Sequence, residues 1–326
     1  MYLNYYKLKK EPFQLTPDPR FLQMAEAHRN ALSILFQGVL MRKGFMVLTG
    51  PVGTGKTTLL HAVMHILSNP SVSKSPLSTA FVVNPTLSRE EFLEFILDEF
   101  EVPCASTSKP RRLAALQQML LETQRRGSTA VLVIDEAHLL TSELLEEIRL
   151  LGNTDSYREK LLQVILSAQP ELNAVLRGQQ HVALRQRIAG WCELRPLTLP
   201  ETKDYITERL HVAGLESPSP FVSSAVERVF DHSHGVPRLI NLICDQCLIL
   251  GAGAGRTQID SHTVEDALTA MGWEIEISER PKPRAEAPIS SASVSPESGV
   301  GFQSCVDLLI QSMKHRRNVA REQDNP

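Results

Sequence analysis

Hydrophobic residues between positions 45 and 194 fall into short runs that alternate with longer amphipathic stretches. The short runs are typical of buried strands, and the longer stretches repeat their hydrophobic positions at helical spacing. Predicted strands are residues 45–49, 80–83, 130–134, 162–167 and 191–194, and predicted helices are residues 57–67, 90–100, 113–125 and 142–151. Buried strands separated by helices favour a parallel sheet that is covered on both faces. The pattern therefore predicts a three-layer α/β fold.

The chain before the first strand divides into two predicted parts. Residues 1–22 are rich in proline and aromatic residues, which favours an extended or turned segment over a helix. Residues 25–41 carry hydrophobic positions at helical spacing and are predicted to form a helix. Residues 1–44 are therefore assigned to the start of the α/β domain, which is predicted to cover residues 1–196.

After residue 196 only helical patterns follow, at residues 201–213, 219–231, 237–251 and 261–271. They predict a small all-α domain over residues 197–275. Residues 276–301 are rich in proline, serine and glutamate, a composition that cannot bury a core, and are predicted to be a linker. Residues 302–326 carry one hydrophobic stripe, for which a short amphipathic helix and a solvated tail are equal alternatives.

One segment has the pattern G-x-x-x-x-G-K-[ST] and lies between the first predicted strand and a predicted helix. Its glycines allow backbone N–H groups to turn toward phosphates without obstruction by side chains. Lys56 is predicted to meet the β- and γ-phosphates, and the Thr57 hydroxyl to ligate Mg²⁺. A glycine-rich turn that binds nothing would not require this spacing. The predicted nucleotide-binding residues are Gly50, Pro51, Val52, Gly53, Thr54, Gly55, Lys56, Thr57 and Thr58.

A second charged motif ends the strand predicted at residues 130–134, where Asp135 and Glu136 follow an apolar run. This places two carboxylates at the edge of the sheet beside the phosphate-binding loop. Asp135 is predicted to hold the Mg²⁺ shell, and Glu136 to polarise the attacking water as general base. An acidic helix start would explain one carboxylate but not the buried strand before it. The letters Asp-Glu-Ala-His also occur in helicases, but the chain has no room for a second RecA-like domain.

These motifs and the following all-α region resemble the AAA+ superfamily, most closely the ExeA-like group (general secretion pathway protein A) and transposition ATPases of the TniB and TnsC type. The likeness covers about residues 1–272. Its weaker signatures are the opening Tyr5-Tyr6 to Phe21-Leu22, Gln169-Pro170-Glu171-Leu172 and the segment from Gly235 to Asn241. The resemblance implies that the all-α domain is a lid on a P-loop ATPase and that the nucleotide is ATP with Mg²⁺.

The resemblance implies roles for two polar residues at strand ends. Gln169 follows the fourth strand, where AAA+ proteins keep the sensor 1 residue that bonds the γ-phosphate or the lytic water. A turn residue explains Gln169 equally well. Asn84 matches the position from which a polar residue restrains the catalytic glutamate, and a cap at the strand end explains it almost as well.

The resemblance also implies roles for two arginines. Arg187 matches the arginine finger, which serves the nucleotide of a neighbouring subunit, and Arg185 is the reserve. A surface arginine pair is the alternative. Arg238 opens a helix of the lid and matches sensor 2, which touches the γ-phosphate. An arginine finger acting across subunits implies self-association into a ring or filament.

Composition limits the partners and the compartment. The formal net charge is −3, so the total charge gives no bulk attraction to nucleic acid or anionic membranes. Five cysteines without a paired framework indicate a reducing, cytoplasmic location. Cys244 and Cys247 form a C-x-x-C in an apolar run, which favours a buried helix over a metal or redox site. No stretch offers the roughly 20 apolar residues of a membrane span.

The sequence therefore predicts an ATP hydrolase that drives a partner. The resemblance favours assembly of a bacterial secretion or cell-envelope export apparatus, with the chain cytoplasmic and held at the inner membrane by a membrane or secretion-machinery protein. The alternative is a DNA-associated regulator of transposition, which predicts salt-dependent DNA binding and stimulation of the ATPase by DNA.

Overall fold

The structure is a computed structural model that describes residues 2–15, 25–69, 76–153 and 159–273. Contacts divide the chain into two compact units. The sheet unit comprises Gln14–Glu208 and Phe230–Leu242, and the helical unit comprises Met1–Phe13, Arg209–Val229 and Ile243–Pro326. The predicted linker at 276–301 and the predicted helix and tail at 302–326 lie outside the described residues, as do residues 1 and 16–24.

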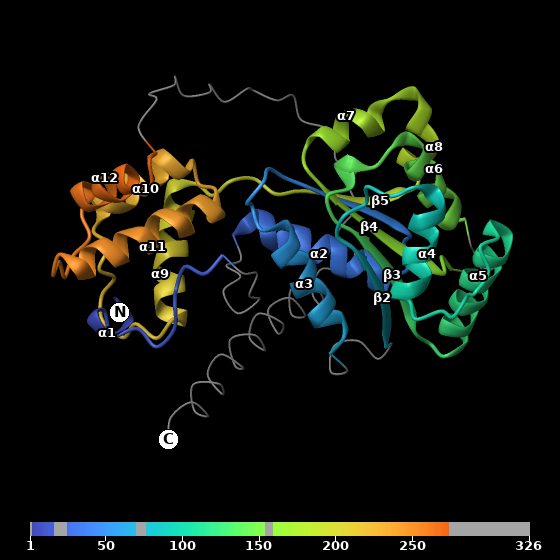
Figure 1. Cartoon of the computed structure of the whole chain (residues 1–326), viewed down its shortest axis with the longest axis horizontal. Coiled ribbons are helices and arrows are strands. Elements are labelled where there is room, and N and C mark those ends of the chain that lie inside the picture. The colour runs from blue at the N-terminus through green and yellow to red at the C-terminus, as the bar shows by residue number, and fades with distance from the viewer. Residues whose placement is uncertain (1, 16–24, 70–75, 154–158, 274–326) are drawn as a thin grey trace, which may run out of the picture. The chain divides into compact units, whose positions relative to one another are not determined.

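The sheet unit is built on five parallel strands (Figure 1), which run in the order β2-β3-β4-β1-β5. Their bounds are β1 Phe45–Thr49, β2 Leu77–Val82, β3 Thr129–Ile134, β4 Leu162–Ala168 and β5 Ile188–Glu193. All residues of β1, β3 and β4 are buried, as expected of strands that are covered on both faces. The predicted three-layer α/β fold is confirmed.

The register of the strands brings their carboxyl ends to one edge of the sheet. Thr49 at the end of β1 lies opposite Ala168 at the end of β4, and Ile134 at the end of β3 lies opposite Leu166. The residues that follow β1, β3 and β4 therefore leave the sheet at the same edge. In open parallel sheets this edge is where ligands bind.

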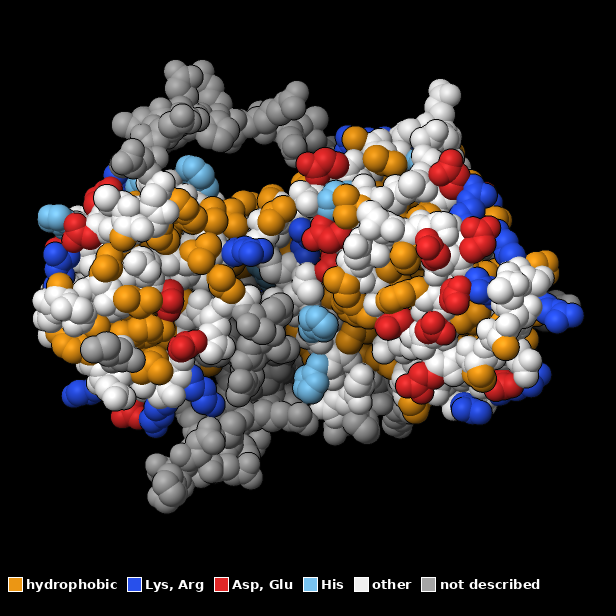
Figure 2. Space-filling view, in the orientation of Figure 1, with side chains coloured by type: hydrophobic (Ala, Val, Ile, Leu, Met, Phe, Trp, Pro, Cys, Tyr) orange, Lys and Arg blue, Asp and Glu red, His pale blue; other side chains and the backbone are white. Residues whose placement is uncertain are grey.

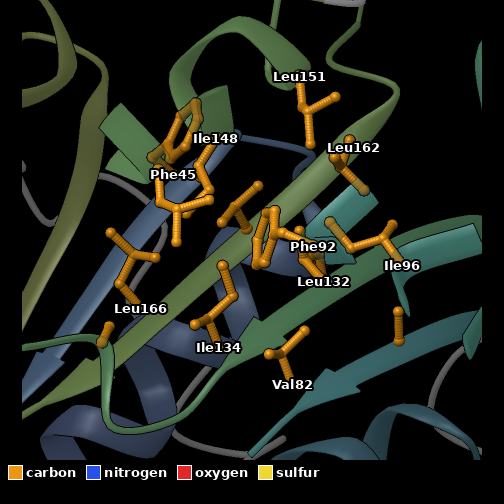
Figure 3. Close-up of a cluster of buried hydrophobic side chains, with 14 of the residues drawn as sticks. Phe45, Val82, Phe92, Ile96, Leu132, Ile134, Ile148, Leu151, Leu162 and Leu166 are labelled. Carbon is orange, nitrogen blue, oxygen red and sulfur yellow. The ribbon is translucent and has the colours of Figure 1, made fainter. Parts of the chain in front are cut away.

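One face of the sheet is covered by α4 Arg89–Glu99, α5 Lys109–Arg125 and α6 Ser142–Leu151. Phe92 and Ile96 of α4 and Ile148 of α6 pack with strand residues in a continuous hydrophobic cluster, which Figure 3 shows in part. Side chains of a strand alternate between the two faces, so Phe45 of β1 points into this cluster and Met46 points to the opposite face.

The opposite face is covered by α2 Glu26–Leu40 and α3 Lys56–Leu67, with α2 against β1 and β5. A Cβ added at Gly38 of α2 would lie 2.0 Å from Sδ of Met46, so the helix approaches the sheet as closely as glycine allows. Further elements that the structure describes are α7 Glu171–Arg177, α8 Val182–Arg185, the short 3₁₀ helices η2 Ala137–Leu139 and η3 Gln179–His181, α9 Leu199–Val212, α10 Ser223–Ser233, α11 Pro237–Gly253 and α12 Ser261–Ala270.

The helical unit joins the start of the chain to the region after residue 208. The Arg209 guanidinium donates to the carbonyl of Pro12, and the Tyr6 hydroxyl donates to the carbonyl of Arg256 at 2.9 Å. Phe13 meets Phe221 edge to face, with ring centroids 6.1 Å apart. The first residues thus group with helices that are distant in sequence, whereas the sequence pattern assigned residues 1–44 to the α/β domain.

The start of the chain also contains a helix where an extended or turned segment was expected. The turn Tyr2–Tyr5 forms α1, and the Tyr2 hydroxyl donates to Asp245 at 2.7 Å. This contact, 243 residues away in sequence, explains why local residue preferences did not indicate the helix. Within the described residues, no helix combines the length and apolar character that a bilayer crossing requires.

Candidate functional site

The phosphate-binding loop leaves β1 at Gly50 and enters α3 at Lys56. Gly53 and Gly55 have φ angles of +80° and +92°, in the region that favours glycine. The ammonium of Lys56 is buried against the loop and donates to the carbonyls of Gly50 at 2.8 Å and Pro51 at 3.1 Å. The loop therefore holds its lysine folded inward over its own backbone, with the first turn of α3 behind it.

The charge of Lys56 is set by opposing influences. Burial lowers the pKa of the ammonium, and the negative charges of Glu136, Asp135 and Glu171 act to raise it. Two of these carboxylates follow the end of β3 and the third lies at the start of α7, so two separate segments of the chain place charge around one lysine. A cation held only by peptide carbonyls can exchange those partners for the oxygens of a phosphate.

Asp135 lies at the centre of the site and is buried. Its Oδ2 accepts from the Thr57 hydroxyl at 2.6 Å, and its Oδ1 accepts from the Ser167 hydroxyl at 2.7 Å. The structure thus brings together the two residues predicted to hold Mg²⁺. Ser167 was not predicted as part of the site, although a polar residue in the buried strand β4 is a signal for a hidden hydrogen bond.

Glu136 follows Asp135 with φ 51° and ψ 35°, a left-handed conformation that is uncommon outside glycine. Its side chain is 41% exposed, whereas Asp135 is buried. The turn that begins here continues as η2 and redirects the chain away from β3. One carboxylate is therefore fixed inside the protein and its neighbour faces solvent, which matches the division between a metal ligand and a base that activates water.

Gln169 emerges directly after β4 and contacts His138, with the Gln169 Nε2 and His138 Nε2 atoms 2.9 Å apart. The other ring nitrogen of His138, Nδ1, lies 3.4 Å from Oε2 of Glu136. The structure therefore places Gln169 at the same sheet edge as the acidic pair. His138 was not predicted as a site residue, and its position beside the two acids was the only sequence signal for it.

Asn84, Arg185 and Arg187 make their hydrogen bonds with residues other than the acidic pair. The Asn84 side-chain oxygen accepts from the Thr86 hydroxyl at 2.6 Å, the contact expected of a cap at a strand end. Arg187 is half-buried after α8 and donates to the carbonyl of Arg149 at 3.2 Å. Arg185 is exposed and donates to the carbonyl of Arg177.

Arg238 lies against the phosphate-binding loop within the sheet unit. Its backbone N–H donates to the carbonyl of Gly53 at 3.2 Å, and a Cβ added at Gly53 would lie 2.9 Å from the Arg238 Cβ. The start of α11 thus packs on the outer turn of the loop. This contact places the backbone of Arg238 beside the loop, and its role as sensor 2 stays a prediction.

A buried histidine supports the loop from α2. His28 is 4% exposed, and its Nε2 lies 2.9 Å from the carbonyl oxygen of Thr54. A carbonyl only accepts, so this nitrogen carries the proton. Burial lowers the pKa of His28, which favours the neutral ring. A polar residue on the buried face of a predicted helix was the sequence signal for this contact, and it was missed.

The donor set fits Mg-ATP. Mg²⁺ is usually bound through one or two carboxylates or hydroxyls together with substrate phosphates, and Asp135 and Thr57 supply one of each at hydrogen-bond distance. The glycines with positive φ and the buried ammonium of Lys56 supply the phosphate-facing part. The arrangement can therefore bind a triphosphate, neutralise it and hold a carboxylate beside its terminal group.

Three comparisons with known proteins bear on this geometry. A family model described as an AAA domain matches residues 39–176. General secretion pathway protein A from Aeromonas hydrophila is 37% identical over 260 residues, which are 79% of this chain and 46% of that protein. The chain thus spans about half the length of this curated relative.

Two solved structures are similar in fold. Cdc6p from Pyrobaculum aerophilum has a TM-score of 0.61 at 20% identity and covers 79% of this chain and 70% of its own. Drosophila ORC, in a structure bound to DNA, has a TM-score of 0.64 at 18% identity and covers 83% of this chain and 66% of its own. These findings show that residues 39–176 match an AAA domain, that the chain has the fold of AAA+ P-loop ATPases, and that it is similar over 79% of its length to general secretion pathway protein A.

Proposed function

We propose that this chain hydrolyses ATP at the edge of the sheet where β1, β3 and β4 end. The observation that carries the proposal is the 2.6 Å hydrogen bond between the Thr57 hydroxyl and Asp135, beside the buried ammonium of Lys56. It joins the two motifs, 78 residues apart, into one site. Mg²⁺ bound there would neutralise charge on the phosphate oxygens.

Each residue of the site has a role in this proposal. Lys56 leaves the carbonyls of Gly50 and Pro51 for the β- and γ-phosphates, and Glu136 takes a proton from the attacking water. Gln169 senses the terminal phosphate. Arg238 couples the presence of this phosphate to the region that begins at α11.

Arg187 acts on the nucleotide of a neighbouring copy, so the active form is a ring or filament. An arginine finger supplied by another subunit stabilises the charge that develops in phosphoryl transfer and is worth roughly 10³–10⁵ in rate. The isolated chain is therefore a slow ATPase, and self-association increases its turnover.

The cellular task we propose is assembly or conformational change of a bacterial secretion or cell-envelope export apparatus. The support is the 37% identity with general secretion pathway protein A, which is a higher identity than any of the solved structures named above shows. The chain acts from the cytoplasm and is held at the inner membrane by a membrane or secretion-machinery protein.

The second candidate is ATP-dependent regulation on DNA. It is favoured by the similarity in fold to Drosophila ORC, whose structure was solved bound to DNA. The charge distribution argues against it, since acidic and basic side chains are interspersed over the face made by α4, α5 and α6 (Figure 2) and the net charge is −3. Non-specific binding to duplex DNA depends on clustered positive charge.

An ATPase assay separates the two candidates. The chain is assayed alone, with duplex DNA at moderate salt, and with inner-membrane fractions from a bacterium that carries a secretion apparatus, beside Lys56→Ala and Glu136→Gln controls. Stimulation by membranes, and not by DNA, supports the export role. Stimulation by DNA that falls as salt rises overturns it in favour of the second candidate.

A further inference from the structure

His138 joins two residues of the proposed hydrolytic site that come from different strands. One of its ring nitrogens contacts Gln169, which follows β4, and the other faces Glu136, which follows β3. We propose that His138 is a positioning residue for ATP hydrolysis, which holds the Glu136 carboxylate in place and links it to Gln169. This inference rests on the proposed function, in which Glu136 is the base.

The backbone keeps His138 beside Glu136. Glu136 adopts a left-handed conformation, and η2 begins directly after it, with the N–H of Leu139 donating to the Glu136 carbonyl at 2.9 Å. This tight turn brings the side chains of Glu136 and His138 to the same side of the backbone. The side chain of His138 is 14% exposed there.

The contact with Gln169 determines which nitrogen of His138 carries the proton. An amide nitrogen only donates, so Nε2 of the ring accepts from Gln169 at 2.9 Å and the proton of the neutral ring resides on Nδ1. That N–H faces Oε2 of Glu136 at 3.4 Å. Gln169 thus directs a hydrogen-bond donor toward the carboxylate of the proposed base.

The Nδ1 atom is buried, and in the described residues its geometry does not complete a hydrogen bond with any partner. A buried donor without an aligned acceptor is unfavourable, so a small rotation of the half-exposed Glu136 toward it lowers the free energy. Hydrogen bonds of catalytic groups are often long before substrate binds and shorten in the complex. The 3.4 Å separation is therefore suited to tighten when nucleotide is present.

The surroundings of Glu136 favour a position near the reacting phosphate. Its negative charge is the main influence that raises the pKa of Lys56, so the carboxylate lies close to the phosphate-binding lysine while it faces His138. Asn84, the residue expected to contact this glutamate, has its side-chain oxygen engaged by Thr86. The side chain that the structure shows facing the Glu136 carboxylate is that of His138.

Four single variants of the full chain, and one double variant, test this inference. His138→Ala removes both contacts, and His138→Asn keeps an amide near the position of Nδ1 and so retains a donor toward Glu136. His65→Ala, an exposed histidine on α3, is the matched control. Glu136→Gln reports on the base itself. Affinity for a fluorescent ATP analogue, kcat and KM are measured for each, and thermal melting checks folding.

We expect His138→Ala to lower kcat on the order of tenfold, less than the 10²–10⁴-fold attributed to a general base, with KM and nucleotide affinity unchanged. His138→Asn recovers part of the loss, and His65→Ala has no effect. In the Glu136→Gln background, His138→Ala produces no further decrease, because the group it positions is already absent.

Three results would overturn the proposal. An unchanged kcat in His138→Ala shows that the histidine is a surface residue, and a raised kcat shows that it restrains the glutamate instead of positioning it. A parallel loss of nucleotide affinity shows a structural role. If His138→Ala does not fold, His138→Asn takes its place in the test. A kcat of His138→Asn that is no higher than that of Glu136→Gln would then also overturn the proposal. Full activity of Glu136→Gln would instead refute the role of Glu136 in the proposed function.

Discussion

The two halves of the site are built in different ways. The phosphate cradle, residues 50–57 with His28 and Arg238, is held by main-chain groups and buried side chains, and Lys56 is only 7% exposed. The hydrolytic edge, which consists of Glu136, His138 and Gln169, is held by contacts between side chains, and Glu136 is 41% exposed. In the proposed function, nucleotide binding therefore relies on the packed core, and hydrolysis relies on groups at its surface.

This difference implies that the two halves respond differently to substitution. Changes in the cradle should alter nucleotide affinity and the stability of the fold together, because the same packing supports both. Changes at the hydrolytic edge should alter turnover and leave affinity and stability nearly intact. Lys56→Ala and Gly53→Ala test the expectation for the cradle.

Among substitutions of the cradle, the largest effect is expected from Lys56→Ala. The substitution removes the charge-assisted hydrogen bonds to the β- and γ-phosphates, a loss of about 3 kcal/mol that corresponds to roughly a 100-fold weaker Kd for ATP. Titration with a fluorescent ATP analogue measures it. Affinity equal to that of the unmodified chain would show that the loop does not bind phosphate.

Asp135→Asn is expected to have the next largest effect, on the metal. Loss of the negative charge beside Thr57 should raise the Mg²⁺ concentration for half-maximal hydrolysis roughly 10–100-fold. A Mg²⁺ titration of ATPase activity measures the change, and excess EDTA should abolish hydrolysis by the unmodified chain. An unchanged Mg²⁺ requirement would remove Asp135 from the metal site.

Gly53→Ala tests whether the cradle is packed as a core. Its φ of +80° alone costs alanine about 1–2 kcal/mol, and the 2.9 Å approach to Arg238 and Val236 adds roughly 1–3 kcal/mol. Thermal melting measures the change. Gly127→Ala is the matched control, because Gly127 has φ +72° with nothing within 4 Å of an added Cβ. Equal losses in the two variants would contradict close packing at the cradle.

The smallest effect concerns a half-exposed ion pair beside the cradle. Arg195 makes two hydrogen bonds to Glu201, at 2.8 and 3.0 Å, and these bonds, with those from Thr198, lower the pKa of Glu201 from 4.5 to about 2. Because the pKa of Glu201 is lower in the folded state, its ionised carboxylate stabilises the fold at pH values above its ordinary pKa. This stabilisation is lost as pH falls from 4.5 toward 2.

Because Arg195 is 44% exposed, solvent screening limits the contribution of the pair to at most about 1 kcal/mol. Glu201→Gln should therefore lower the free energy of unfolding slightly at pH 7, and the difference from the unmodified chain should shrink below pH 4.5. Urea unfolding at both pH values measures this. A loss of unfolding free energy as large as that in Gly53→Ala would contradict the account, because the buried cradle would then be no more sensitive to substitution than the more exposed ion pair beside it.

Sequence patterns predicted the parts of the fold that local signals determine. The helix predicted at 142–151 has those bounds because Thr141 caps its start, accepting from the N–H of Leu144, and Gly152 follows its end. The buried strands at β1 and β3 were evident from continuous apolar runs. The short helices α7 and α8 were not predicted, because neither is long enough to show helical periodicity.

Contacts between distant residues could not be predicted from spacing. His28 reaches Thr54 across 26 positions, and His138 reaches Gln169 across 31. The P-loop lysine and the acidic pair were predictable because their chemistry requires fixed residue types at fixed places in strand–loop–helix units. Their supporting residues have no such requirement, since many side chains can donate or accept a hydrogen bond.

The central claim is that nucleotide binding and hydrolysis belong to separable halves of one site. The most direct test compares Glu136→Gln with the unmodified chain in one experiment, with Mg-ATP affinity and single-turnover hydrolysis measured on the same preparation. The account predicts an unchanged Kd with hydrolysis lowered roughly 10²–10⁴-fold. Normal hydrolysis, or a Kd that weakens in step with hydrolysis, would contradict it.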